Sequence, residues 1–113
     1  MVNERIVNKI NSFPRFSLIK NQTPIHSLEN MSRKLNIDLK IKRDDLTGLA
    51  AGGNKTRKLE FLIGKALYDK AEIILTAGWN HSNHALQTAA ASGRAGLESI
   101  LFLKGAETYR GSL

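Results

Sequence analysis

The sequence contains no cysteine, two prolines, one tryptophan and no long apolar run. The absence of cysteine excludes disulfide bonds, thiolate catalysis and cysteine-ligated metal or iron–sulfur centres. A membrane-spanning helix needs about 20 consecutive apolar residues, and no stretch approaches that length. Residues 1–20 mix Asn, Glu, Arg and Lys with apolar residues, unlike a secretory signal peptide. We therefore expect a cytoplasmic protein with no membrane partner.

Positive charge is in excess, with 17 Lys and Arg residues against 10 Asp and Glu residues and a net charge of +7. Such an excess is found in nucleic-acid-binding proteins, where the basic residues gather in patches. Here they are dispersed, and the longest basic runs are pairs. We expect no nucleic-acid partner, and a basic nucleotide- or RNA-binding module remains the alternative from another functional class.

The 113 residues suit one domain. Residues 1–26, which contain both prolines, predict an N-terminal arm, and residues 27–113 predict a partial α/β domain that we expect to be truncated. Apolar periodicity predicts the following elements: a helix over 27–35 capped by Ser27, a strand over 38–42, a helix over 55–70, a buried strand over 72–76, a helix over 83–92 closed by Gly93 and Gly96, and a strand over 99–103. This alternation indicates one parallel sheet with three strands.

Lys55 is the strongest candidate for chemistry, because it follows the flexible pair Gly52-Gly53 and begins a strongly periodic helix. The positive end of the helix dipole disfavours an ammonium group, as burial does. A lysine with a lowered pKa is a nucleophile that forms Schiff bases with carbonyl compounds or pyridoxal phosphate. An ordinary surface lysine in a first helical turn is the alternative.

The loops 43–54 and 77–82 both follow predicted strands, so parallel topology places them at the same sheet edge, where α/β proteins bind ligands. Lys55 would then face Ser82, Asn83 and His84 across one crevice. Ser82 or Asn83 could equally be a plain helix cap, or offer hydroxyl, amide and backbone N–H groups to a carboxylate or phenolic oxygen. His81 and His84 have no third ligand nearby in the sequence, so we expect no metal site.

A phosphate-binding P-loop is nearly matched between Gly48 and Thr56, but Asn54 separates Gly53 from Lys55 and displaces the lysine by one position. Nucleotide binding is therefore only a weak alternative.

Three segments together resemble one enzyme family: Lys42-Arg43-Asp44-Asp45-Leu46-Thr47-Gly48, Gly52-Gly53-Asn54-Lys55-Thr56-Arg57-Lys58-Leu59-Glu60 and Ser82-Asn83-His84. They resemble the D-cysteine desulfhydrase and 1-aminocyclopropane-1-carboxylate deaminase family of pyridoxal-phosphate enzymes. The resemblance implies a parallel, three-layer α/β sandwich of the tryptophan synthase β-like type, of which this chain would be the N-terminal portion. The family's glycine-rich phosphate cup, its pyridine-nitrogen partner and its substrate-facing tyrosine come later in the chain, and Tyr109 matches none of them.

The resemblance also implies roles for individual residues. Lys55 would form the Schiff base with the cofactor and move a proton at the substrate, and Asn54 would help to orient the cofactor. Asn83 would hydrogen-bond the phenolic oxygen of pyridoxal 5'-phosphate, Ser82 would meet the substrate carboxylate, and Asn83 and His84 would also line the substrate site. Trp79-Asn80 replaces small or aliphatic residues of the family and could reshape the pocket.

The substrate would be a small amino acid. The segment His84-Ala-Leu-Gln87-Thr88 resembles the desulfhydrase branch more closely, which implies conversion of D-cysteine to pyruvate, ammonia and hydrogen sulfide. Deamination of 1-aminocyclopropane-1-carboxylate is the alternative. The resemblance further implies that the full-length form is a homodimer.

Overall fold

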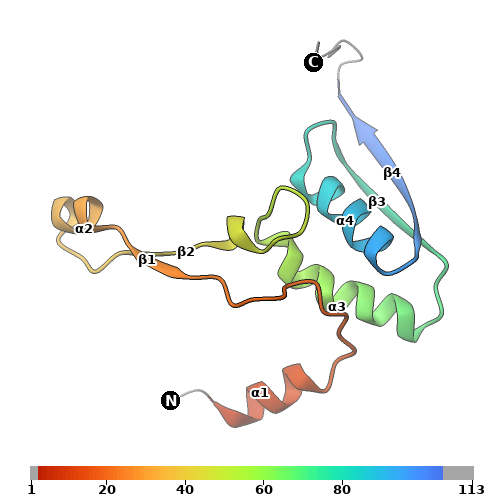
Figure 1. Cartoon of the computed structure of the whole chain (residues 1–113), viewed down its shortest axis with the longest axis horizontal. Coiled ribbons are helices and arrows are strands. Elements are labelled where there is room, and N and C mark those ends of the chain that lie inside the picture. Colours follow the sequence, from red (N-terminus) through yellow and green to blue (C-terminus); the bar gives the residue numbers. More distant parts are fainter. Residues whose placement is uncertain (1–2, 106–113) are drawn as a thin grey trace.

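The computed structural model describes residues 3–105 (Figure 1), so Tyr109 lies outside the described part. The elements in chain order are α1 (Glu4–Asn11), β1 (Ile25–Ser27), α2 (Glu29–Leu35), β2 (Lys40–Lys42), the 3-10 turn η1 (Asp44–Leu46), α3 (Lys55–Tyr68), β3 (Ile73–Trp79), α4 (Asn83–Arg94) and β4 (Glu98–Lys104).

The strands form two separate pairs. β3 and β4 are parallel, with Leu75 opposite Ile100, as the apolar runs and the intervening helix predicted. β1 and β2 are antiparallel, with His26 opposite Ile41. The prediction of one three-stranded parallel sheet was therefore wrong for residues 38–42. With α2, these two short strands project from the rest of the molecule as an arm (Figure 1).

The core lies where α3 packs against α4 and α4 packs against both β3 and β4. Its buried apolar side chains come from the N-terminal segment, the loop before α3, and the two helices: Leu18, Leu49, Leu59, Ile63 and Ala91. The opposite face of the β3–β4 pair is open, with Leu75 62% exposed and Trp79 66% exposed. The prediction of a buried strand over 72–76 was therefore wrong for this side of the strand, because exposure alternates along β3.

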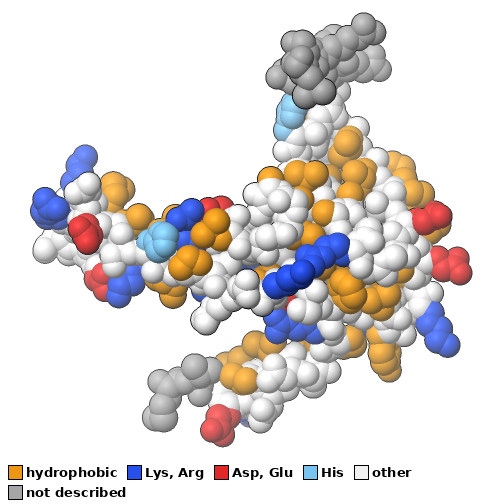
Figure 2. All heavy atoms as spheres, in the orientation of Figure 1, with side chains coloured by type: hydrophobic (Ala, Val, Ile, Leu, Met, Phe, Trp, Pro, Cys, Tyr) orange, Lys and Arg blue, Asp and Glu red, His pale blue; other side chains and the backbone are white. Residues whose placement is uncertain are grey.

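Three local features differ from expectation. Helix α1 was not predicted; Asn3 caps it by accepting a hydrogen bond from the Arg5 N–H, and exposed apolar side chains lie along it (Figure 2). Ser27 lies in β1 rather than capping α2, which has no side-chain cap. Helix α4 continues through Gly93 to Arg94, and Gly96, at φ +72°, turns the chain after it.

Glu60 anchors the N-terminal segment to α3. Its carboxylate accepts hydrogen bonds from the N–H groups of Leu18 at 2.8 Å and Ile19 at 2.9 Å, and from the Arg15 guanidinium. Burial alone would raise the pKa of Glu60, but the bonds from Ile19, Leu18 and Arg15 outweigh it and lower that pKa. The segment also lies tightly on the helix, since a side chain at Gly64 would come within 2.6 Å of the Pro14 carbonyl oxygen.

Candidate active site

Lys55 is the first residue of α3, at the end of the helix where backbone N–H groups are unpaired. Its Nζ donates a hydrogen bond to Oδ1 of Asn54 at 2.9 Å. The first turn of α3 carries Lys55, Arg57 and Lys58 and no acidic residue, and Lys and Arg side chains gather over this region in Figure 2. Cations at a helix N-terminus oppose the helix dipole, so this turn favours an anionic ligand.

The loop before Lys55 depends on two glycines with positive φ, Gly52 at +76° and Gly53 at +126°. A Cβ on Gly52 would lie 1.9 Å from the Asp45 carbonyl oxygen, and a Cβ on Gly53 would lie 2.6 Å from the amide nitrogen of Asn83. Both positions therefore need glycine for conformation and for space. The loop can approach α4 only because it has no side chains here.

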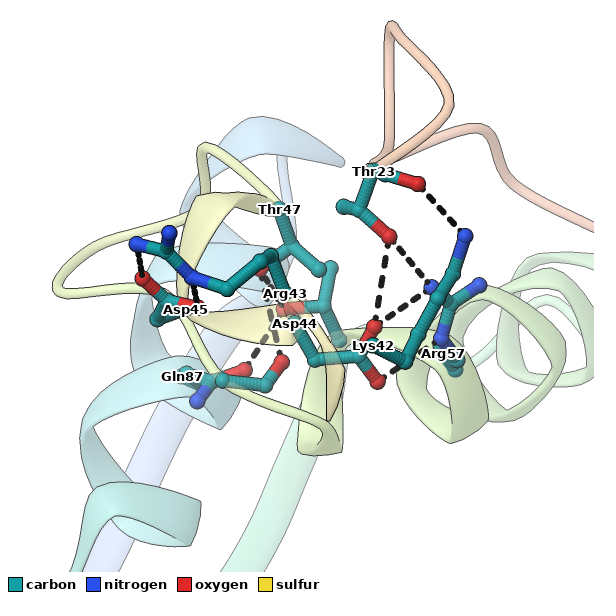
Figure 3. Close-up of polar contacts among 10 residues, drawn as sticks. Thr23, Lys42, Arg43, Asp44, Asp45, Thr47, Arg57 and Gln87 are labelled. Atoms are coloured by element: carbon teal, nitrogen blue, oxygen red, sulfur yellow. Dashed lines mark hydrogen bonds and ion pairs between the residues drawn. The ribbon is translucent and has the colours of Figure 1, made fainter. Parts of the chain in front are cut away.

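Asp44 ties the same loop to α3 (Figure 3). Arg57 donates to its carboxylate through Nε at 2.9 Å and through Nη2 at 2.5 Å. These bonds are the main reason that the pKa of Asp44 is lowered. Arg57 also donates to Thr23 Oγ1 at 3.0 Å, and Lys42 Nζ donates to the Thr23 carbonyl at 2.5 Å. The motif residues Asp44 and Arg57 thus form an ion pair that joins the loop to α3. The sequence had indicated no role for either residue.

The second half of the site is the N-terminus of α4. Ser82 is its N-cap, with Oγ accepting from the Ala85 N–H at 3.2 Å. This contact is the one expected if Ser82 acts as a helix cap, the alternative given from the sequence. Asn83 Nδ2 donates to the Gly52 carbonyl at 3.4 Å. The two loops therefore meet, as predicted, although β2 and β3 do not share the sheet whose edge was expected to bring them together.

His84 belongs to the first turn of α4, and its ring lies between this helix and β3. Its Nε2 is 3.2 Å from Thr76 Oγ1 and its Nδ1 is 3.5 Å from Thr88 Oγ1. Burial lowers the pKa of His84, and the positive charges of Lys58 and Lys55 lower it further. The imidazole is therefore neutral near pH 7 and can both donate and accept a hydrogen bond in the neighbourhood of Lys55. Among residues 3–105, no group of three His, Asp or Glu side chains is arranged to hold a metal ion.

Gln87 was missed by the sequence analysis as a site residue. It is fully buried on α4, one helical turn beyond Asn83, and its Nε2 donates to the Gly52 carbonyl at 2.7 Å. The signal that could have identified it is a long polar side chain on the face of α4 that otherwise carries small residues such as Ala91.

The profile of the family described as "Pyridoxal-phosphate dependent enzyme" matches residues 16–109 of this sequence. The chain belongs to this family. The α/β fold of the tryptophan synthase β-like type, predicted from three motifs, is confirmed by this match and by a crystal structure described as an ACC deaminase homologue. That structure has a TM-score of 0.88 and 48% sequence identity, over 97% of this chain and 34% of the other.

Two groups of relatives carry the names that the motifs indicated. A Pyrococcus horikoshii protein with the provisional name 1-aminocyclopropane-1-carboxylate deaminase is 52% identical over 88% of this chain and 31% of its own length. The D-cysteine desulfhydrase of Yersinia enterocolitica is 46% identical over 86% of this chain and 29% of its own length. The chain thus spans about a third of the length of the curated relatives it matches.

The residues present fit the cofactor of this family. A primary amine on Lys55 starts one helix and an amide on Asn83 starts another, and Gly53, two residues before Lys55, lies against the Asn83 amide. The cationic first turn of α3 suits an anionic group. Within the described part of the chain, no helix combines the length and apolar composition needed to cross a bilayer.

Proposed function

We propose that this chain provides the lysine and the substrate-carboxylate turn of a pyridoxal-phosphate-dependent lyase or deaminase that acts on a small amino acid. The observation that carries the proposal is the joint between Gly52 and α4, which places the segment of Lys55 beside that of Ser82 and Asn83. A P-loop nucleotide site needs the lysine directly after its second glycine, and Asn54 occupies that position here.

In this proposal, Lys55 holds the cofactor aldehyde and carries a proton to or from the substrate. Asn54, which already accepts a bond from Lys55 Nζ, orients that end of the loop. Asn83 donates to the phenolic oxygen of the cofactor. The cofactor, when bound, supplies an electron-withdrawing ring that stabilises negative charge on the substrate.

The substrate side is formed by the start of α4. Ser82 Oγ and the unpaired N–H groups of the first turn receive the substrate carboxylate, which the helix dipole also favours. His84, neutral and held by Thr76, faces the substrate as an uncharged hydrogen-bonding group. A neutral imidazole adds no further positive charge to the basic first turn of α3.

D-cysteine is the substrate that we prefer, with pyruvate, ammonia and hydrogen sulfide as products, because the sequence from His84 to Thr88 resembles the desulfhydrase branch. Deamination of 1-aminocyclopropane-1-carboxylate is the second candidate, and the provisional name of the Pyrococcus relative favours it. We also propose that the full-length enzyme is a cytoplasmic homodimer; these two points rest on the sequence expectation alone.

The test is reductive labelling. The 113-residue chain is mixed with pyridoxal 5'-phosphate, treated with borohydride and mapped by peptide mass spectrometry. We expect the label on Lys55, no label there in Lys55→Arg, and an unchanged label in the matched control Lys65→Arg, which changes an exposed lysine on the same helix. Label spread over several lysines in proportion to their exposure would contradict the proposal.

The choice of substrate is tested separately. Sulfide release from D-cysteine is compared with ammonia release from 1-aminocyclopropane-1-carboxylate, using cofactor-loaded protein at matched concentrations. Ammonia from the second substrate without sulfide from the first would favour the deaminase alternative.

A further inference from the structure

A chain of buried polar groups lies behind the glycine loop. Thr47 Oγ1 is 3.1 Å from Thr56 Oγ1, Thr56 Oγ1 donates to Gln87 Oε1 at 2.6 Å, and Gln87 Nε2 donates to the Gly52 carbonyl at 2.7 Å. Thr56 and Gln87 are 0% exposed and Thr47 is 3% exposed. Buried polar groups are costly unless each is paired, and in the described residues no buried side-chain nitrogen or oxygen lacks a partner.

The donor-to-acceptor direction of this hydrogen-bond network is fixed by the chemistry of the groups at its two ends. The Gly52 carbonyl only accepts, so the amide nitrogen of Gln87 must face it and the amide oxygen must face Thr56. The single hydroxyl hydrogen of Thr56 is then used on Gln87, so Thr47 is the donor in the 3.1 Å contact with Thr56, and the Gly53 carbonyl also lies within reach of the Thr47 hydroxyl at 3.4 Å. Reversing the Gln87 amide would place two acceptors against each other, so only one arrangement is stable.

This network joins the two halves of the proposed site. Gly52 precedes Lys55 by three residues, and Gln87 follows Asn83 by one turn of α4. Gly53 lies so close to the amide that a Cβ there would be 2.6 Å from Gln87 Nε2. The Gln87 amide therefore sets how far the loop of Lys55 stands from the helix of Asn83.

We propose that Gln87 is a positioning residue for the cofactor site. Through the Gly52 carbonyl it holds the Lys55 loop against α4, so that the Lys55 amine and the Asn83 amide can engage one pyridoxal phosphate together, without Gln87 touching the cofactor. This inference rests on the proposed function. The competing explanation is that Gln87 only contributes to stability, like any satisfied buried polar residue.

The test compares Gln87→Met with Ser92→Ala. Methionine has a similar length and no amide, so the Gly52 carbonyl loses its 2.7 Å bond and keeps the longer bond of 3.4 Å from Asn83 Nδ2. Ser92 is the matched control, because it is equally buried on α4 and, among residues 3–105, its hydroxyl donates to the Thr88 carbonyl of its own helix, at 2.9 Å. Thr56→Val is the second variant; it keeps the shape, removes the far link of the network and covers the case that Gln87→Met does not fold.

Each protein is titrated with pyridoxal 5'-phosphate by absorbance, under conditions where circular dichroism finds it folded, and its unfolding by urea is measured without cofactor. We expect Kd to rise about tenfold in Gln87→Met and about threefold in Thr56→Val, because the loop of Lys55 loses the short bond that sets its distance from α4, or the group that orients that bond. Ser92→Ala should lose stability and keep its Kd within about twofold.

Two results would overturn the inference alone: wild-type Kd in folded Gln87→Met and Thr56→Val, or an equal rise of Kd in Ser92→Ala. A wild-type chain that takes up no cofactor and no label at Lys55 would instead overturn the proposed function, and this inference with it.

Discussion

Replacing Glu60 by alanine removes the acceptor of four hydrogen bonds that fasten the N-terminal segment to α3. The N–H groups of Leu18 and Ile19 would be left without it; an unpaired buried group such as that of Leu18 costs about 1–3 kcal/mol, and the partly buried N–H of Ile19 costs about 1 kcal/mol. The Arg15 side chain is 53% exposed and can be hydrated instead, so its bonds add less than about 1 kcal/mol. We expect Glu60→Ala to reduce the free energy of unfolding by about 3–4 kcal/mol.

Glu60→Gln separates the charge from the shape. The amide oxygen can still accept from Leu18 and Ile19, so we expect a loss of only about 1 kcal/mol at pH 7. Because the folded pKa of Glu60 is lowered, its charged form contributes stability above the unfolded pKa of about 4.3. That contribution is lost as the pH falls through the folded pKa. The difference between wild type and Glu60→Gln should therefore shrink in acid.

Urea unfolding followed by circular dichroism, at several pH values from about 7 down to about 3, measures both effects. The reasoning is refuted if Glu60→Ala unfolds at the wild-type urea concentration. It is also refuted if the gap between wild type and Glu60→Gln stays constant across this pH range.

Three further predictions concern the loops and α4. Gly48 and Gly52 have nearly equal φ, +77° and +76°, but of the two only Gly52 faces a backbone oxygen. In urea unfolding, Gly48→Ala should reduce the free energy of unfolding by about 1 kcal/mol, and Gly52→Ala should reduce it several times more. Equal reductions in the two variants would disprove the clash at Gly52. Ser82→Ala should lower stability by about 1 kcal/mol while Ser82→Asp, which keeps a capping oxygen, should not, as thermal unfolding will test. By NMR, His84 should titrate below about pH 6.5, and Lys58→Gln should raise the pKa of His84. The folded state binds this proton less readily than the unfolded state, so the fold should lose stability as the pH drops below about 6.5.

The helices and the β3–β4 pair could be predicted because their apolar periodicity is long and local. Leu59 and Ile63 recur on the face of α3 that is buried. The pairing of β2 with β1 could not be predicted, since three-residue strands carry no signal of their partner or direction. The open side of β3 could not be predicted either, because an apolar run does not reveal which face of a sheet is covered.

The contact between the loop before Lys55 and the start of α4 was predicted through an incorrect intermediate. A shared sheet edge was expected, whereas the contact arises because α3 packs on α4 and Gly52-Gly53 permits a close approach. Two buried polar residues were not identified: Gln87, which fixes this approach, and Glu60, which holds the N-terminal segment on α3. Glu60 and Gln87 are polar residues on otherwise apolar helix faces. The burial of such residues depends on tertiary partners that are distant in sequence; Glu60 and its partner Leu18, for example, are 42 residues apart.

The single tryptophan stands on the uncovered side of β3, two-thirds exposed, with Lys104 Nζ 5.8 Å from its ring centroid. Its fluorescence should therefore resemble that of indole in water, with red-shifted emission and ready quenching by acrylamide. The same position makes Trp79 a built-in optical reporter, because anything that excludes water from this side of the strands would shift the emission to shorter wavelengths without any added dye.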